Sequence, residues 1–335
     1  MKISGTSDLG RLANMQKRAI DTRASLNRAA TEMTTGENAS RYEATAGNLT
    51  RLFALERSLD RNAVFTETIE LTEIRLDTVQ NGLGLILKPI EDLSVNLATS
   101  VGLGDVSNSL LHANTARNAF ADTVSVLNSQ VQGLSLFAGT ATDGPALASA
   151  DSILADLDAL AAGSATATDA IAAIDDYFSA TGAFRTSGYI GSTDDLAAVD
   201  IGEGRRLKYA VRADADEIIA VLRSQALAAV VAGGAFSGDT AARMEMLGAA
   251  GNSMLAAKEG VLDLRAAVGV SQNALERGKA SRVSERDTLD LARNQILEID
   301  YDAAASRYQA LETQLNVIYT VTSRLADLSY TNFMK

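Results

Sequence analysis

Both ends of the chain carry the same apolar repeat, and this feature constrains the fold more than any other. Within residues 1–35, small or apolar residues recur at alternating gaps of three and four: Leu12, Met15, Ala19, Thr22, Leu26, Ala29 and Met33. Residues 300–335 repeat the pattern: Ala304, Tyr308, Leu311, Leu315, Ile318, Thr322, Leu325 and Ser329. This spacing is typical of helices that pack along a narrow seam. We therefore predict helices over residues 7–35 and 301–329, each about 40 Å long, which pair with each other and bring the termini together.

The N-terminal seam is weak, because its only large apolar residues are Leu12, Met15, Leu26 and Met33. Ordering a residue costs roughly 1–2 kcal/mol of backbone entropy, and burying one large apolar side chain returns about 1.5–3 kcal/mol. A single two-stranded contact leaves such an arm marginal. We predict arms that are frayed in the monomer and ordered inside a polymer; a closed intramolecular coiled coil is the alternative. The predicted subunit-packing residues are Leu12, Met15, Ala19, Leu26, Met33, Tyr308, Leu311, Leu315, Ile318, Leu325 and Leu328.

The rest of the chain reads as a helical bundle with a small inserted domain. Helical patterns cover residues 48–98, 106–132 and 239–298, with a kink or break expected at Pro89. The insert begins in a turn-rich stretch and contains short helices near 153–160 and 170–178, a β-hairpin of 197–201 with 207–211, and a helix over 214–232. The predicted fold is mostly α, with a small α+β middle domain. The predicted segments are an N-terminal coiled-coil arm and elbow (1–47), the two bundle halves (48–136 and 240–299), the middle domain (137–239) and a C-terminal coiled-coil arm (300–335).

Composition narrows the possible functions. The 335 residues include no cysteine and one histidine, which excludes disulfides and thiolate metal sites and leaves His112 without a histidine partner. The net charge of −12 disfavours nucleic-acid binding. No apolar run is long enough to span a membrane, and the N-terminus lacks the apolar region of a cleaved signal peptide. We expect that the chain neither binds nucleic acid nor inserts into a membrane.

No residue cluster predicts an enzyme, a cofactor or a metal site. Phosphate-binding, dinucleotide-binding, zinc-protease and serine-hydrolase motifs are absent from the sequence. The paired carboxylates Asp175-Asp176 and Asp194-Asp195 lack a calcium-loop pattern, so we interpret them as parts of solvated turns. We expect His112 to have a packing role, the methionines of residues 244–254 to fill a core, and the basic cluster to form local ion pairs. These candidates are Asp175, Asp176, Asp194 and Asp195; Met244, Met246 and Met254; and Arg205, Arg206 and Lys208 with Asp200 and Glu203.

Four local motifs, taken in order, resemble the flagellin-like axial proteins of bacterial flagella. Met33–Gly36 resembles the L-S-[ST]-G that ends the first helix of that family, and Leu325–Phe333 resembles its L-S-L-x-x-[FY] terminus. Leu136–Ala146 resembles the Y-L-F-x-G-x-x-T-D-x-P-x segment of the hook-associated proteins that join hook to filament, which flagellins proper lack. Tyr189–Gly191 and the hairpin after it resemble the middle domain of those junction proteins. The elbow at 36–47 lacks the usual S-D-D-P-like turn, which indicates a divergent branch.

The resemblance implies a structural adaptor of the flagellum. Such a protein is exported unfolded by the flagellar type III machinery with an export chaperone, and its N-terminal arm serves as an uncleaved signal. It forms an extracellular ring of like subunits at the hook–filament junction, between the hook-side junction protein and flagellin. The alternatives are a flagellin, a soluble coiled-coil chaperone or signalling protein and, more distantly, an enzyme that uses Asp175 or Asp194.

Overall fold

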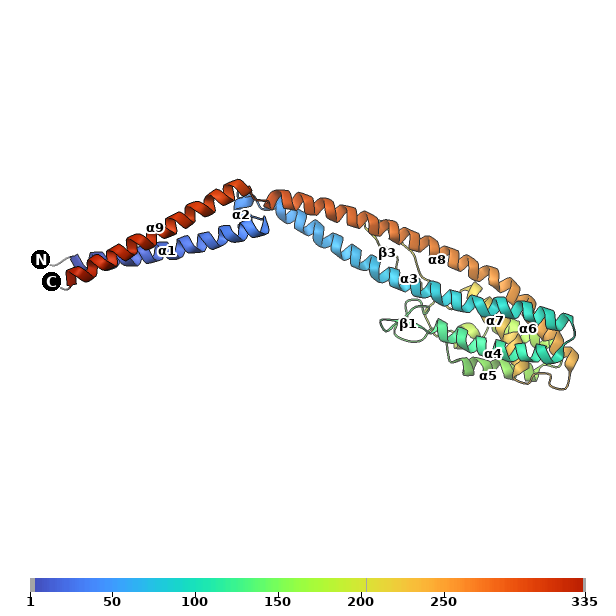
Figure 1. Cartoon of the computed structure of the whole chain (residues 1–335). Coiled ribbons are helices and arrows are strands. Elements are labelled where there is room, and N and C mark those ends of the chain that lie inside the picture. Colours follow the sequence, from blue (N-terminus) through green and yellow to red (C-terminus); the bar gives the residue numbers. More distant parts are fainter. Residues whose placement is uncertain (1–3, 203, 334–335) are drawn as a thin grey trace. The chain divides into compact units, whose positions relative to one another are not determined.

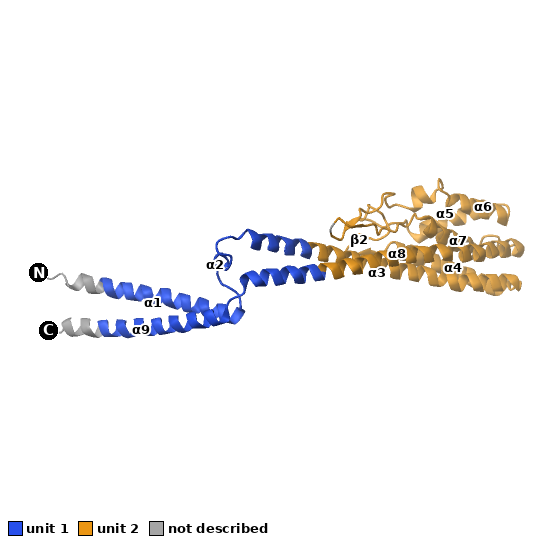
Figure 2. Ribbon diagram, turned by 90° about the horizontal axis from the view of Figure 1, so that it is seen from above, with its two compact units in different colours: residues 1–63, 283–335 blue, residues 64–282 orange. Residues whose placement is uncertain are grey.

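The computed structural model describes the backbone of residues 4–202 and 204–333, and side chains from residue 10 to residue 325 within those ranges. The chain forms two compact units, residues 1–63 with 283–335 (unit 1) and residues 64–282 (unit 2), coloured separately in Figure 2. The described elements are mainly α-helices, with four strands of two residues each. The predicted fold class, mostly α with a small α+β insert, is confirmed.

Unit 1 is built around the two terminal helices. Helix α1 (Ser4–Thr35) and helix α9 (Tyr301–Phe333) lie side by side in both views (Figures 1 and 2) and run antiparallel. Gly36 ends α1 as predicted, with φ +74° and its N–H donating to the Glu32 carbonyl oxygen at 2.8 Å. The unit also contains α2 (Arg41–Ala44), residues 50–63 of α3 (Thr50–Gly102) and residues 283–297 of α8 (Thr240–Leu297).

Unit 2 contains the main apolar core. Residues 64–102 of α3 and 240–282 of α8 run antiparallel, and ion pairs such as Lys279–Glu73 (2.9 Å) and Lys258–Glu91 (2.8 Å) join them. Helix α7 (Asp216–Ala232) is covered on most sides, since twelve of its seventeen residues are buried. Asp105, Ser149 and Thr166 cap three of the surrounding helices. The helices packed with α7 are α4 (Val106–Leu127), α5 (Ala150–Gly163) and α6 (Ala167–Tyr177).

The β part of unit 2 consists of two antiparallel hairpins, β1 (Gln130–Val131) with β2 (Leu134–Ser135) and β3 (Val199–Asp200) with β4 (Arg206–Leu207). A short π-helix, η1, spans Phe184–Gly188. Backbone hydrogen bonds fasten residues 137–148 to the segments after η1 and before α7: Ser192 N to Ala138 O (2.9 Å), Ile190 N to Ala146 O (2.9 Å) and Ala213 N to Phe137 O (2.9 Å).

Two predicted elements are shorter in the structure than the sequence indicated, and α3 remains one helix at Pro89. The helix expected over 106–132 ends at Leu127, because Gln132 and Gly133 both have positive φ and form the turn of the β1–β2 hairpin. Helix α3 continues through Pro89 without the break considered for that position. Pro89 has no backbone N–H to donate to the helix, but buried neighbours such as Ile86 and Ile90 hold the helix in the core. The β3–β4 hairpin lies where predicted, with strands of only two residues each.

Candidate assembly interface

The predicted seam residues fall on the sides of α1 and α9 that are shielded from solvent. On α1, Leu12, Met15, Ala19, Leu26 and Met33 are half-buried. The positions between them in the repeat, Thr22 and Ala29, are buried at 7% and 1% exposure. Because α9 is the helix that packs along α1, these residues lie at the α1–α9 contact.

On α9, Tyr308, Leu311, Leu315 and Leu325 are half-buried, and Ile318 is buried. The side chain of Leu328 lies outside the described residues. The structure therefore brings ten of the eleven predicted packing residues to one two-helix contact.

This contact leaves much apolar surface uncovered. Ile20 on α1 and Val317 and Tyr319 on α9 are 69%, 55% and 49% exposed. Most large seam side chains are only half-buried as well. A helix pair with apolar residues outside its own seam can pack against further helices. The pair of helices α1 and α9 thus keeps apolar surface that is available for packing against further helices.

An elbow joins α1 to the connection between α8 and α9. Glu37 and Glu298 form an antiparallel bridge. The Asn38 amide donates to the Leu297 carbonyl at 2.7 Å, and the Ile299 amide donates to the Gly36 carbonyl at 3.1 Å. The two chain segments at the elbow are therefore held as a short ladder.

Glu32 anchors this elbow and was not identified from the sequence. Its side chain is 2% exposed, and its carboxylate accepts a hydrogen bond from the Ala39 amide at 3.1 Å. Arg307 of α9 lies 3.8 Å from the other carboxylate oxygen. The sequence offered one indication of this role, which is the position of Glu32. It is the only acidic residue between Asp21 and Gly36, and it adjoins the seam residue Met33.

One member of each acidic pair considered for catalysis, Asp175 or Asp195, takes part in a structural ion pair. Asp175 lies in α6, not in a turn as expected, and Arg223 of α7 donates to its carboxylate at 2.5 and 3.0 Å. Arg212 donates to Asp195 at 2.5 Å and to the buried Asp214 at 2.7 Å. The Asp175 contact joins α6 to α7, and the Arg212 contacts join the segment before α7 to the loop that contains Asp195.

The histidine and methionine candidates have packing environments. His112 is half-buried on α4, and Met246 and Met254 are fully buried in the core, as predicted, while Met244 is half-buried. Among the described residues, no group of three or more histidine, cysteine or acidic side chains could hold a metal ion. None of the helices, over the part of the chain that the structure describes, combines the length and apolar character of a membrane span.

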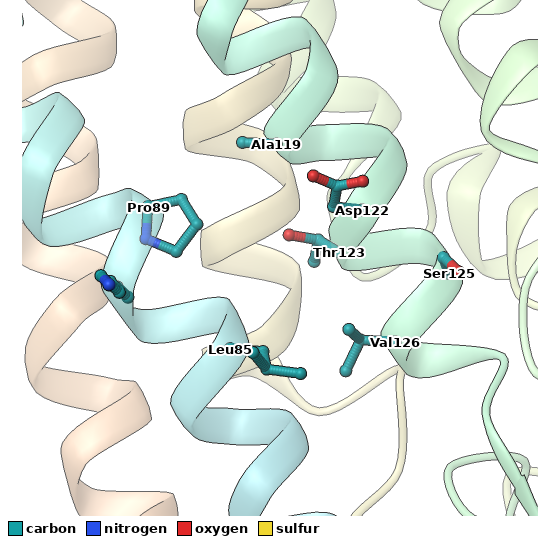
Figure 3. Close-up of a pocket in the computed structure, with 8 residues that line it drawn as sticks. Leu85, Pro89, Ala119, Asp122, Thr123, Ser125 and Val126 are labelled. Carbon is teal, nitrogen blue, oxygen red and sulfur yellow. The ribbon is translucent and has the colours of Figure 1, made fainter.

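An open groove of about 410 Å³ lies between α3 and α4 of unit 2. Figure 3 shows Leu85 and Pro89 of α3 facing Ala119, Thr123 and Val126 of α4 across it. Lys88, Asp122 and Ser125 complete the lining. The groove is mainly apolar, with one carboxylate and one amine, so it offers a surface for packing more than a paired acid and base.

No family model and no curated protein matches this chain in sequence. Solved structures that share its fold include two flagellar proteins. Bacillus cereus FlgL aligns with a TM-score of 0.51 at 15% identity, over 72% of this chain and 100% of that one. A protein from Vibrio parahaemolyticus described as a flagellar hook-associated protein aligns with a TM-score of 0.51 at 14% identity, over 72% of this chain and 94% of that one. The chain therefore has the fold of these two proteins, which confirms at the level of fold the resemblance identified from its sequence.

Proposed function

We propose that this chain is a structural subunit of the bacterial flagellum that assembles at the hook–filament junction through its terminal helices. The observation that carries the proposal is the α1–α9 pair, whose large seam residues are half-buried and whose Ile20, Val317 and Tyr319 are exposed. The fold shared with two flagellar proteins supports the same conclusion.

The physical reason is that a two-helix contact whose large seam side chains are mostly only half-buried removes too little apolar surface from water to be stable alone. Neighbouring subunits in a ring would cover the remaining faces of the arms and supply the missing burial, at about 25 cal/mol per Å² of apolar surface. Assembly and ordering of the arms are then one coupled process. Leu328, whose side chain is outside the described residues, belongs to the same proposed seam.

The elbow would transmit this packing to the rest of unit 1. Because the ladder at Asn38 and Ile299 joins the two arms at their base, α1 and α9 enter the assembly as one element. The buried Glu32 holds the loop that follows α1.

The proposed partners are like subunits in a ring, the hook-side junction protein and flagellin. Export through the flagellar type III machinery, assisted by an export chaperone and without cleavage of a signal, would deliver the chain to the extracellular end of the hook. In this proposal the chain performs no catalysis and binds no cofactor.

Deletion of the gene in its native host tests the proposed position. We expect cells that retain hooks, lack attached filaments and release flagellin into the medium, with all three reversed by a plasmid copy. Normal filaments on the deletion strain would contradict the proposal.

Polymerisation of the purified chain separates an adaptor from the flagellin alternative. We expect no long filaments by electron microscopy under salting-out conditions in which flagellin from the same host polymerises. Long filaments of this chain alone would identify it as a filament subunit instead.

A further inference from the structure

Charge is strongly segregated on the surface of unit 2. Residues 141–184, which include α5 and α6, contain seven aspartates and no lysine, arginine or histidine. Two of the seven are held by arginines, as Arg117 pairs with Asp158 at 2.8 Å and Arg223 pairs with Asp175. Four others on these two helices are exposed and are called the acidic face below: Asp151, Asp156, Asp169 and Asp176.

The opposite charge is gathered on the β3–β4 hairpin. Residues 138–239 contain six basic residues, and three of them, Arg185, Arg212 and Arg223, are engaged with aspartates at 2.5–2.7 Å. The other three are Arg205, Arg206 and Lys208, and all of their side chains are exposed. Among the residues that the structure describes, none forms an ion pair with these three, which we call the basic hairpin.

The basic hairpin and the acidic face are attached to different helices of unit 2. The hairpin rests on α3 and α8, because the side chains of Ile201 and Ile69 both lie 3.5 Å from the position of a methyl group on Gly278. The acidic face belongs to α5 and α6, which pack on α7, with α5 also contacting α4. Figure 1 shows β3 beside α3 and α8, and α5 beside α4. The two patches are therefore separate surfaces of one chain.

From this arrangement we infer that the basic hairpin of one subunit contacts the acidic face of a second copy of this chain. Two different patches that meet in this way make a head-to-tail contact, and repetition of such a contact gives a ring when the rotation between neighbouring copies adds up to a full turn. The inference rests on the proposed function, which places like subunits side by side.

Electrostatics gives a reason for such a contact. Each copy carries a net charge of −12, so neighbouring copies repel one another unless complementary patches meet. Exposed ion pairs add little affinity individually, but complementary patches select the orientation in which two surfaces approach. The basic hairpin would thus set the register of neighbours, while the arms supply the bulk of the burial.

Zero-length carbodiimide cross-linking of isolated flagella tests the contact, because this reagent joins a lysine amine to a carboxylate only when the two touch. We expect a cross-linked dimer of this chain whose peptide map joins Lys208 to Asp151, Asp156, Asp169 or Asp176. Lys208→Arg keeps the positive charge and removes the amine, so it should abolish this dimer and leave incorporation into flagella unchanged.

Charge reversal on the basic hairpin provides a second test of the contact. Arg205→Glu with Arg206→Glu leaves Lys208 in place and should lower the dimer yield about tenfold, or prevent incorporation, through repulsion from the acidic face. Lys88→Glu with Arg277→Glu changes the net charge equally at two other exposed positions and should alter neither.

The outcomes separate the two proposals. If wild-type chain is missing from isolated flagella by immunoblot, the proposed function fails. If it is present but the dimer map contains no Lys208 link, or Arg205→Glu with Arg206→Glu behaves as the matched control does, the hairpin contact is wrong and the junction role stands.

Discussion

At the scale of single residues, Gly139 shows how the segment that resembles junction proteins is held. Its φ is +59°, and a methyl group at this position would lie 2.4 Å from the Ser192 carbonyl oxygen and 2.6 Å from that of Asp194. Both are backbone atoms of a loop whose Asp194 carbonyl also accepts the Thr140 amide at 3.1 Å. Only glycine allows the two segments to approach this closely.

We predict that Gly139→Ala destabilises unit 2 by about 2–4 kcal/mol, because a left-handed alanine costs about 1–2 kcal/mol and the overlap with backbone adds a similar amount. Urea unfolding followed by circular dichroism measures this change. Gly144→Ala is the control, since nothing lies within 4 Å of its added methyl group. Equal unfolding midpoints for the two variants would refute the explanation.

Two buried tyrosines give a pH-dependent prediction. Burial, aided by the charge of Asp156, raises the pKa of Tyr177 to about 12. Burial, aided by Asp214, raises the pKa of Tyr189 to about 12. The folded state therefore holds these protons more tightly than the unfolded state does. Their contribution to stability should be complete below pH 10 and should be lost as the pH rises through about 12.

Absorbance of tyrosinate during alkaline titration of the folded chain measures this effect. Tyr177 and Tyr189 should ionise late, and Tyr177→Phe and Tyr189→Phe should each remove one late step. A titration that neither substitution alters would contradict the assignment.

At the scale of elements, the strength of each local pattern decided what the sequence could predict. The long repeats located α8, α9 and the end of α1 to within a few residues, because burial and helix capping act locally. The β1–β2 hairpin was missed because its turn at Gln132–Gly133 directly follows a strong helical pattern.

Long-range contacts explain what else the sequence could not reveal. Asp175 reads as part of a polar turn until α7 brings Arg223 beside it. Glu32 reads as a solvated residue until the elbow folds back over it and buries it. Arg223 and Arg307, the cations beside Asp175 and Glu32, are distant from them in sequence, so no spacing rule identifies these two pairs.

Leu315→Asp tests the seam at the scale of the arm. A charge placed on this half-buried position would need a polar partner that an apolar interface does not supply. We expect unit 2 of this variant to unfold at the same urea concentration as unit 2 of the wild-type chain. Incorporation of the variant into flagella should fall below about a tenth of the wild-type level.

Gln314→Asp, at the exposed neighbouring position, introduces the same charge and should be incorporated normally. Incorporation of Leu315→Asp at the level of this control would count against packing of the seam between subunits.

At the scale of the whole molecule, the charge is distributed unevenly along the chain. Residues 1–35 contain six basic and three acidic residues, whereas residues 138–239 contain six basic and fifteen acidic ones. The basic N-terminal arm is therefore distinct from the acidic insert, and we propose that the arm carries the export signal.

Deletion of residues 1–20 should abolish secretion, because it would remove the signal that the export machinery reads. The measurement is an immunoblot of culture medium against cell lysate. Equal amounts of the truncated and full-length chains in the lysate serve as the control for expression. Secretion of the truncated chain at the wild-type rate would rule out this role for the arm.

We propose that the arms gain their order from neighbouring subunits. In α7 twelve of seventeen residues are buried, whereas α1 and α9 cover each other along one narrow seam of mostly half-buried side chains. Local opening should therefore require far less free energy in the arms than in α7. A chaperone or signalling protein with a stable coiled coil would show no such difference.

Hydrogen exchange of the purified monomer in dilute buffer, read by mass spectrometry of peptides from α1, α9 and α7, tests this claim most directly. We predict that amides of α1 and α9 exchange at least about a hundredfold faster than those of α7 in the monomer, and become protected in isolated flagella. Protection of α1 and α9 equal to that of α7 in the monomer would contradict the claim.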